Sequence, residues 1–409
     1  MRADEATGLG RWGGALLRGA TTATQTVHAA VGRRGDAVAV AIVGPDAAPF
    51  IAIRRVMTDT VYRTVAFGVD AGARIVGIVA ARHVDDSTSL TDTPRGNQAL
   101  ALVNGWHGDR LACSGSPLSL PMALRHDGRD LPADPDQLRA AFPNATGRLV
   151  VFAHGLAETE DYWRYRAQDH YGDPTVSYGS RLRDDLKYTP LWVRYNTGRR
   201  ISDSGADLSG LLDGVVANWP VPVTSLALIG HSMGGLVVQS ALAQGTASDW
   251  IALVRDTVSI ATPHHGAALE QRVAAVAAWA GTRESLTWLA AVLRHRSVGI
   301  KDLRHGNLVP QDWVGHDPDD PVSHRVDVAV YPGARHHLAL STICRNTDGP
   351  VGTRIGDLLV TPVSGRGGPD GGRFTQTPAS SVHIVGGLHH FDSLNHPDVY
   401  PQIRTWLTH

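Results

Sequence analysis

Short apolar runs alternate with segments of helical length from about Gly147 to the C-terminus. Each run is rich in Val, Leu and Ile and has the length of a single strand. The runs are Leu149–Ala153, Leu191–Tyr195, Leu226–Ile229, Val254–Ile260, Leu338–Ile343 and Val382–Val385. Parallel sheets covered by helices on both faces have this alternation, because their strands are buried on two sides. The sequence therefore predicts an α/β fold with a mostly parallel sheet.

The chain of 409 residues exceeds the usual size of one domain, and its patterning divides it into three regions. Residues 1–90 are predicted to form a mainly helical accessory region, since apolar side chains recur at helical spacing over 58–81. Residues 91–145 would connect this region to the main domain through a strand hairpin that turns at Asp127-Gly128 and joins the sheet. Residues 146–409 would form the α/β domain.

The composition describes an ordinary globular protein and gives no sign of a polyanionic partner. The formal net charge of −1 argues against a nucleic-acid partner. Cys113 and Cys344 are the only cysteines, and we interpret them as unpaired thiols of a reducing compartment. The first 25 residues lack the continuous apolar core of a signal peptide, and no stretch has the length of a membrane span. We expect a cytoplasmic protein, with weak peripheral membrane contact through the N-terminal segment left open.

One of the apolar runs ends in a serine between glycines. The stretch Leu226–Gly235 reads LALIGHSMGG, in which a strand breaks at Gly230 and a helix opens after Ser232. A serine on such a sharp turn has a strained backbone, and its hydroxyl projects from the carboxyl end of the sheet. This context predicts that Ser232 is a nucleophile.

A serine nucleophile needs a base, a carboxylate that orients the base, and an oxyanion hole. On this type of sheet the acid and then the base follow the serine along the chain. Asp357 lies in a Gly-Asp turn, with Asp348 and Asp327 as weaker rivals for the acid, and the loop after the last strand offers His389, His390 and His396 as bases. The backbone N–H groups of Met233 and Leu156 are the expected oxyanion donors.

These motifs together resemble the lipase and esterase branch of the α/β-hydrolase superfamily. The resemblance covers roughly Gly147 to the C-terminus and rests on five markers: His154-Gly155, Gly230-His231-Ser232-Met233-Gly234-Gly235, Thr262-Pro263-His264-His265-Gly266, Gly356-Asp357-Leu358-Leu359-Val360 and Gly387-Leu388-His389-His390. It implies the α/β-hydrolase fold with a helical cap insertion at about 264–335. It also implies a small-molecule or lipid ester of a carboxylic acid as substrate, no cofactor, and His390 as the base. Leu358 departs from the family pattern, which has glycine there.

Three further side chains are candidates for contact with the substrate, namely His231, His264 and Trp163. Each stands in a position where a packing role is also common. The paired histidines of the sequence invite a zinc hypothesis, but they lack the spacing of a metallohydrolase, so we expect no metal. Two alternatives to an ester hydrolase stay open at this point. An acyltransferase would use the same triad, and a non-catalytic binding module could be built on the same scaffold.

Overall fold

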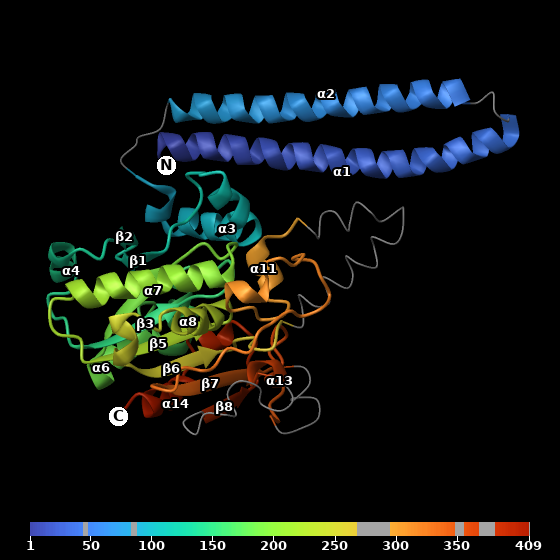
Figure 1. Cartoon of the computed structure of the whole chain (residues 1–409). Coiled ribbons are helices and arrows are strands. Elements are labelled where there is room, and N and C mark those ends of the chain that lie inside the picture. The colour runs from blue at the N-terminus through green and yellow to red at the C-terminus, as the bar shows by residue number, and fades with distance from the viewer. Residues whose placement is uncertain (44–47, 83–87, 268–294, 348–355, 368–380, 409) are drawn as a thin grey trace. The chain divides into compact units, whose positions relative to one another are not determined.

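A computed structural model describes residues 1–43, 48–82, 88–267, 295–347, 356–367 and 381–408 (Figure 1). The described residues divide into two compact units. The first holds residues 1–90 as far as they are described, together with 116–118, His295 and Arg296. The second holds the remaining residues from Thr91 onward.

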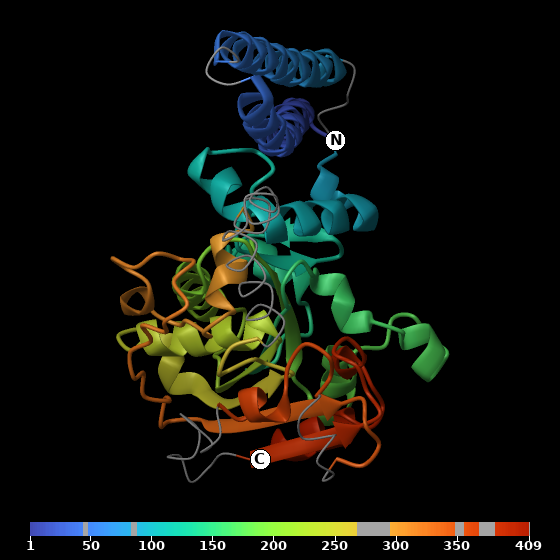
Figure 2. The same cartoon turned by 90° about the vertical axis from the view of Figure 1, so that its right-hand side faces the viewer.

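The first unit is built on a pair of long antiparallel helices, α1 (Ala3–Val43) and α2 (Ala48–Ala81), which run side by side in Figures 1 and 2. The helices approach closely at Gly10 and Gly77, because a Cβ atom built on Gly10 would lie 2.7 Å from the Cα of Gly77. Only glycine permits backbones to come this near. The predicted N-terminal helical extension is confirmed, and the 58–81 segment lies within α2. In the described part of the chain, no helix has both the length and the apolar character to cross a membrane.

The second unit is built on an eight-stranded, mostly parallel sheet, which confirms the predicted fold class. The strands lie in the order β2-β1-β4-β3-β5-β6-β7-β8. Their bounds are β1 Ala123–His126, β2 Arg129–Leu131, β3 Arg148–Ala153, β4 Thr189–Arg194, β5 Ser225–His231, β6 Val254–Ile260, β7 Arg335–Thr342 and β8 Ser381–Gly386. All pairs from β4 to β8 are parallel. Each of the six apolar runs found in the sequence therefore forms a strand.

A hairpin adds two antiparallel strands at one edge of this sheet. Strand β1 pairs with β2 on one side and with β4 on the other. The turn between β1 and β2 has positive φ at both central residues, 45° at Asp127 and 74° at Gly128. Two-residue hairpin turns of this mirror-image type match the twist of the flanking strands, and they require residues that tolerate positive φ. The Asp-Gly pair supplies them.

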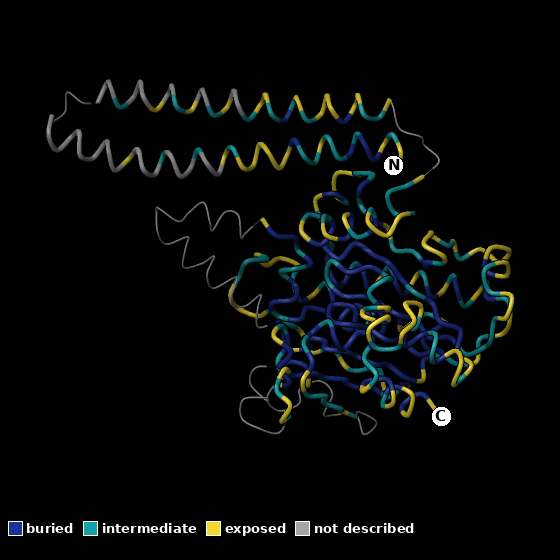
Figure 3. The backbone as a smooth tube through the Cα atoms, turned by 180° about the vertical axis from the view of Figure 1, so that it is seen from behind, coloured by how far each residue is buried: buried dark blue, intermediate teal, exposed yellow. Residues whose placement is uncertain are grey.

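Helices cover both faces of the sheet. The described helices of this unit are α3 Pro94–Cys113, α4 Pro135–Ala141, α5 Ala167–Tyr171, α6 Tyr178–Leu186, α7 Ile201–Asn218, α8 Met233–Gln244, α11 Val298–Asp302, α13 Pro362–Gly365 and α14 Tyr400–Trp406. Helices α7 and α8 pack against one face, and α6 and α14 pack against the other. The buried residues are concentrated in the strand layer between them (Figure 3).

Strand β3 explains why the apolar runs are continuous. Leu149 and Val151 belong to the core beneath α7 and α8, whereas Val150 and Phe152 belong to the core beneath α6 and α14. Because successive side chains point to opposite faces, a strand covered on both sides buries consecutive side chains and favours a run of apolar residues. The helical cap insertion predicted at about 264–335 is described only in part, because residues 268–294 lie outside the described residues.

Candidate active site at the carboxyl ends of the strands

Ser232 stands alone between β5 and α8 as a one-residue turn. Its backbone has φ 52° and ψ −122°, a combination that L-residues with a side chain rarely adopt. The Ser232 N–H donates to the carbonyl of Ile260 at 2.8 Å, which ties the turn to the end of the neighbouring strand β6. The strained backbone expected from the sequence is confirmed, and Ser232 is 9% exposed.

The glycines around Ser232 are required by close contacts on three sides. A Cβ atom on Gly230 would lie 2.4 Å from the nitrogen of Gly235, inside the turn itself. A Cβ atom on Gly234 would lie 2.1 Å from the carbonyl oxygen of Ala153, the last residue of β3. A Cβ atom on Gly235 would lie 2.0 Å from Oγ1 of Thr262. The absence of side chains therefore brings the start of α8 against the ends of β3 and β6.

His390 and Asp357 are hydrogen-bonded to each other. His390 Nδ1 donates to Asp357 Oδ2 at 2.9 Å, and the His390 N–H donates to the Asp357 carbonyl at 3.1 Å. Burial alone would raise the pKa of Asp357, but the His390 ring and two backbone N–H groups outweigh it, so this pKa is lowered. An ionised Asp357 holds the proton of His390 on Nδ1 and leaves Nε2 free to accept another.

The turn that carries Asp357 departs from the usual sequence at Leu358. Asp357 Oδ1 accepts the N–H groups of Leu359 at 3.0 Å and Val360 at 2.8 Å. To wrap the backbone around the carboxylate, Leu358 adopts φ 85°, a conformation that favours glycine, with its side chain 62% exposed. The structure therefore keeps the glycine-type turn although the residue is leucine.

The rivals for acid and base lie elsewhere. His389 has a side chain that is 39% exposed, and it pairs with Asp392 at 3.2 Å. His396 lies beside His170, with ring centroids 4.9 Å apart. Asp327 is exposed, and Asp348 lies outside the described residues. Of the candidates that the structure describes, only His390 and Asp357 are brought together.

The loop that carries the base is linked to the serine turn through His231, the residue before Ser232. The rings of His231 and His390 have centroids 4.8 Å apart, and His231 Nε2 donates to the His390 carbonyl at 3.2 Å. Within the described part of the chain, the Ser232 hydroxyl makes no hydrogen bond of its own. Nucleophile–base hydrogen bonds are often loose in a free enzyme and tighten with substrate bound.

Two backbone N–H groups have no acceptor among the described residues, those of Met233, next to Ser232, and of Leu156, in the loop after β3. Their neighbours are already engaged: the Gly155 N–H donates to Glu158 at 2.6 Å, and the Ala157 N–H donates to Thr197 at 3.1 Å. Because Gly234 holds the start of α8 against the end of β3, these two unengaged donors belong to adjoining segments. They are the pair that the sequence suggests for an oxyanion hole.

The three candidate substrate contacts are all buried. Trp163 is 1% exposed and packs edge-on against Phe152, with ring centroids 4.9 Å apart. His231 is 0% exposed and is enclosed by Glu158 and His390. His264 is 4% exposed and lines a small cleft with Gln239 and Tyr331. In the described structure, Trp163 and His231 are core side chains under the turn, and His264 borders a cleft on the flank of α8.

Glu158 is the residue of this site that the sequence did not reveal. It is 2% exposed, accepts the Gly155 N–H, and pairs with His231 Nδ1 at 3.0 Å. The two partners lie 73 positions apart in the sequence, so no local motif links them. The available signal was a charged residue three positions after Gly155, in the loop that follows the apolar run Leu149–Ala153.

Among the described residues, no group of three or more His, Cys, Asp or Glu side chains has an arrangement that could hold a metal ion. The groups that the site does offer are a hydroxyl, an imidazole held by a carboxylate, and backbone N–H donors.

The sequence of residues 144–330, a little under half of the chain, matches the family model described as a PGAP1-like alpha/beta domain. This match includes Leu156 and Ser232 but stops before Asp357 and His390. No curated protein sequence matches the chain.

The solved structures that resemble this one include lipases and esterases. The mature lipase BlEst2 of Bacillus licheniformis is 17% identical, with a TM-score of 0.41, and the match covers 64% of this chain and 92% of the lipase. The Pyrococcus furiosus esterase Pf2001 is 15% identical, with a TM-score of 0.38 and coverage of 64% and 82%. The Bacillus subtilis carboxylesterase CesB is 14% identical, with a TM-score of 0.35 and coverage of 64% and 84%. Likenesses this distant assign no activity to the chain.

The parallel sheet, the strand-turn-helix at Ser232 and the match over 144–330 together confirm the fold that the sequence predicted: this chain has the α/β-hydrolase fold, and its residues 144–330 are similar to a PGAP1-like alpha/beta domain.

Proposed function

We propose that this protein is a serine hydrolase of carboxylic esters that works through an acyl-enzyme intermediate. The observation that carries the proposal is the 2.9 Å hydrogen bond between His390 and Asp357, formed beside a serine with a strained backbone. A carboxylate-bound imidazole next to a turn serine is the arrangement that activates a hydroxyl as nucleophile.

The steps assign one role to each group. His390 Nε2 removes the proton of Ser232, whose oxygen attacks the ester carbonyl. The N–H groups of Met233 and Leu156 donate to the oxyanion of the tetrahedral intermediate. His390 then gives its proton to the departing alcohol, which leaves an acyl-Ser232 ester, and afterwards activates a water that releases the acid. Asp357 stays ionised and stabilises the imidazolium.

The test combines labelling with turnover. Purified protein is treated with a fluorophosphonate probe and assayed on p-nitrophenyl esters from short to long acyl chains. We expect labelling at Ser232 and hydrolysis of at least part of the series. A folded Ser232→Ala variant should lose both, with activity falling by several orders of magnitude.

Two results would contradict the proposal. Wild-type protein that is neither labelled nor active would favour a non-catalytic binding module. A Ser232→Ala variant that kept more than about a tenth of the activity would exclude this serine as nucleophile, because its loss should cost several orders of magnitude. Adding alcohols to the assay distinguishes the alternative acyltransferase, which would pass the acyl group to the alcohol instead of water.

A further inference from the structure

A buried pair of charged side chains lies directly behind the site, and the mechanism above makes no use of it. Glu158 and His231 are 2% and 0% exposed, and the His231 Nδ1 atom lies 3.0 Å from Oε1 and 3.1 Å from Oε2 of Glu158. Neither side chain is placed to touch a substrate, since both are covered by the core.

The hydrogen-bond partners of His231 determine which of its ring nitrogens carry a proton. Its Nδ1 faces the Glu158 carboxylate, and its Nε2 faces the His390 carbonyl oxygen at 3.2 Å. A carbonyl accepts and never donates, and an ionised carboxylate does the same. Both ring nitrogens must therefore carry a proton to make both bonds, which makes His231 an imidazolium.

The direction of both pKa shifts agrees with this charge state. Burial lowers the pKa of His231, but the Glu158 carboxylate more than offsets it, and the pKa is raised above its usual value. Burial likewise raises the pKa of Glu158, but His231 and the Gly155 N–H outweigh it, and the pKa is lowered.

The pair contacts each of the three segments that supply the chemistry. Glu158 Oε2 accepts the Gly155 N–H at 2.6 Å, next to the oxyanion donor Leu156. His231 is the residue before Ser232. Its ring lies against that of His390, with centroids 4.8 Å apart, and its Nε2 holds the carbonyl of the same residue. One salt bridge thus links the oxyanion loop, the nucleophile turn and the base loop.

We propose that Glu158 and His231 are a charged positioning pair, which fixes the oxyanion loop and the His390 loop relative to Ser232. This inference rests on the proposed function. A buried ion pair is a poor way to gain stability, because apolar residues of similar size often stabilise a core as well or better. An ion pair does supply directed donors and acceptors, and a displacement of about 1 Å in an active site can cost ~10²-fold in rate.

The variants are Glu158→Gln, His231→Asn and the double variant. In the Glu158→Gln variant, His231 loses its counter-ion and with it the second proton, so the salt bridge is replaced at best by an uncharged and weaker hydrogen bond from the glutamine amide to Nδ1. We expect kcat on p-nitrophenyl esters to fall by roughly 10- to 100-fold with KM nearly unchanged, because the residues orient groups and do not bind substrate. The double variant should be no slower than the slower single variant, since the pair acts as a unit.

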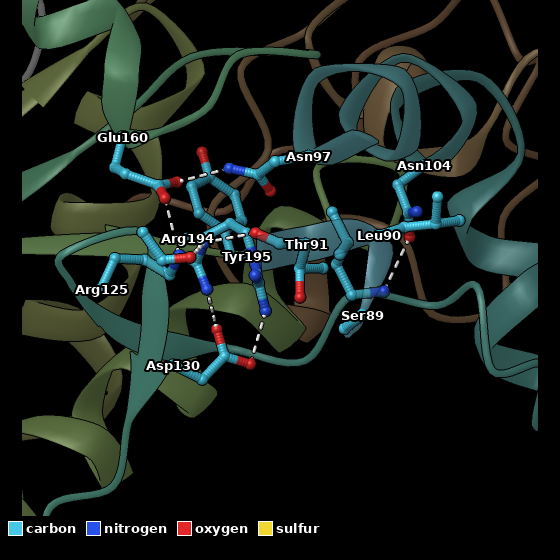
Figure 4. Close-up of polar contacts among 12 residues, drawn as sticks. Ser89, Leu90, Thr91, Asn97, Asn104, Arg125, Asp130, Glu160, Arg194 and Tyr195 are labelled. Carbon is cyan, nitrogen blue, oxygen red and sulfur yellow. Dashed lines mark hydrogen bonds and ion pairs between the residues drawn. The ribbon is translucent and has the colours of Figure 1, made fainter. Parts of the chain in front are cut away.

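A matched control is available two residues away. Glu160 is also a carboxylate in an ion pair, with its side chain 9% exposed, and it accepts from Arg125 Nε at 2.6 Å and from Asn97 Nδ2 at 3.1 Å. Figure 4 shows this second cluster, in which Asp130 also pairs with Arg125 and Arg194. In the described structure Glu160 bonds to neither His231 nor His390. Glu160→Gln should therefore keep kcat within about threefold. It should lower stability, because breaking a buried ion pair generally destabilises the fold.

Nuclear magnetic resonance tests the charge state apart from activity. Wild-type protein at pH 7 should show two ring N–H protons for His231, both absent in His231→Asn. A single ring N–H proton would overturn the imidazolium. Glu158→Gln with unchanged kcat, or a loss matched by Glu160→Gln, would overturn the positioning role while phosphonate labelling of the wild type still upheld the proposed function. A wild type that takes no label would reject the proposed function and the positioning role together.

Discussion

Replacing Gly234 with alanine should disable the site through a single added methyl group. The Cβ atom would lie 2.1 Å from the Ala153 carbonyl oxygen and 2.6 Å from that of His154, and both neighbours are backbone atoms. Real Cβ atoms essentially never come within 3.0 Å of another heavy atom. The start of α8 and the end of β3 must therefore separate by about 1 Å, a displacement that can cost ~10²-fold in rate.

The magnitude follows from what this separation does. The Met233 N–H belongs to α8 and the Leu156 N–H to the loop after β3, so the two oxyanion donors would move apart. Removing one such donor costs about 10²–10³-fold in kcat, or ~3–4 kcal/mol. We expect Gly234→Ala to lose roughly 10²-fold in kcat/KM and about 1–3 kcal/mol of stability, the usual cost of overpacking.

Gly210→Ala is the control for this experiment. Gly210 is an exposed residue inside α7, and a Cβ atom there would meet nothing within 4 Å. The same substitution should therefore raise stability by roughly 0.5–1 kcal/mol and leave turnover unchanged. Both variants would be assayed on a short p-nitrophenyl ester, with circular dichroism to establish that they are folded. A folded Gly234→Ala protein with more than a third of wild-type kcat/KM would refute the reasoning.

Two further predictions concern the acid and the base. His390→Ala should lose activity by several orders of magnitude, whereas His389→Ala should keep most of it, because only His390 is bound to Asp357; the reverse result in steady-state kinetics would exchange the two assignments. The lowered pKa of Asp357 stabilises the fold above the carboxyl's unfolded-state pKa, and this contribution is lost as the pH falls through the lowered value. The difference in unfolding free energy between wild type and Asp357→Asn should therefore shrink in urea titrations taken from pH 6 towards pH 3. A difference that stayed constant would show that ionised Asp357 adds nothing to stability.

Local sequence was sufficient wherever a short segment determines its own geometry. The stretch Leu226–Gly235 encodes a buried strand, a strained turn and a helix start, and Asp127-Gly128 encodes a turn with two positive φ angles. Both were predictable because burial on two faces and tolerance of positive φ are properties of the residues themselves. For α1 the sequence predicted only that the region is helical, because the glycines and polar residues of this helix give no clear apolar stripe.

Long-range partners could not be predicted in the same way. Nothing near Glu158 in the sequence indicates that a histidine in a distant turn will neutralise it, because the contact exists only after β3 and β5 have paired. Leu358 is a departure of another kind. It stands where the family pattern has glycine, yet the backbone hydrogen bonds to the carboxylate hold the turn in the glycine-type conformation.

The order of strands also has a consequence for how activity is lost. Ser232 follows β5 in the middle of the sheet, whereas the acid and the base follow β7 and β8, and β8 pairs only with β7 among the described strands. Edge elements open at a lower free energy than central ones. Fraying of this one edge would carry away Asp357 and His390 and leave most of the fold intact. Under mild denaturant the protein should therefore stop turning over substrate before its far-ultraviolet circular dichroism changes, and dilution should restore activity faster than refolding of the whole chain.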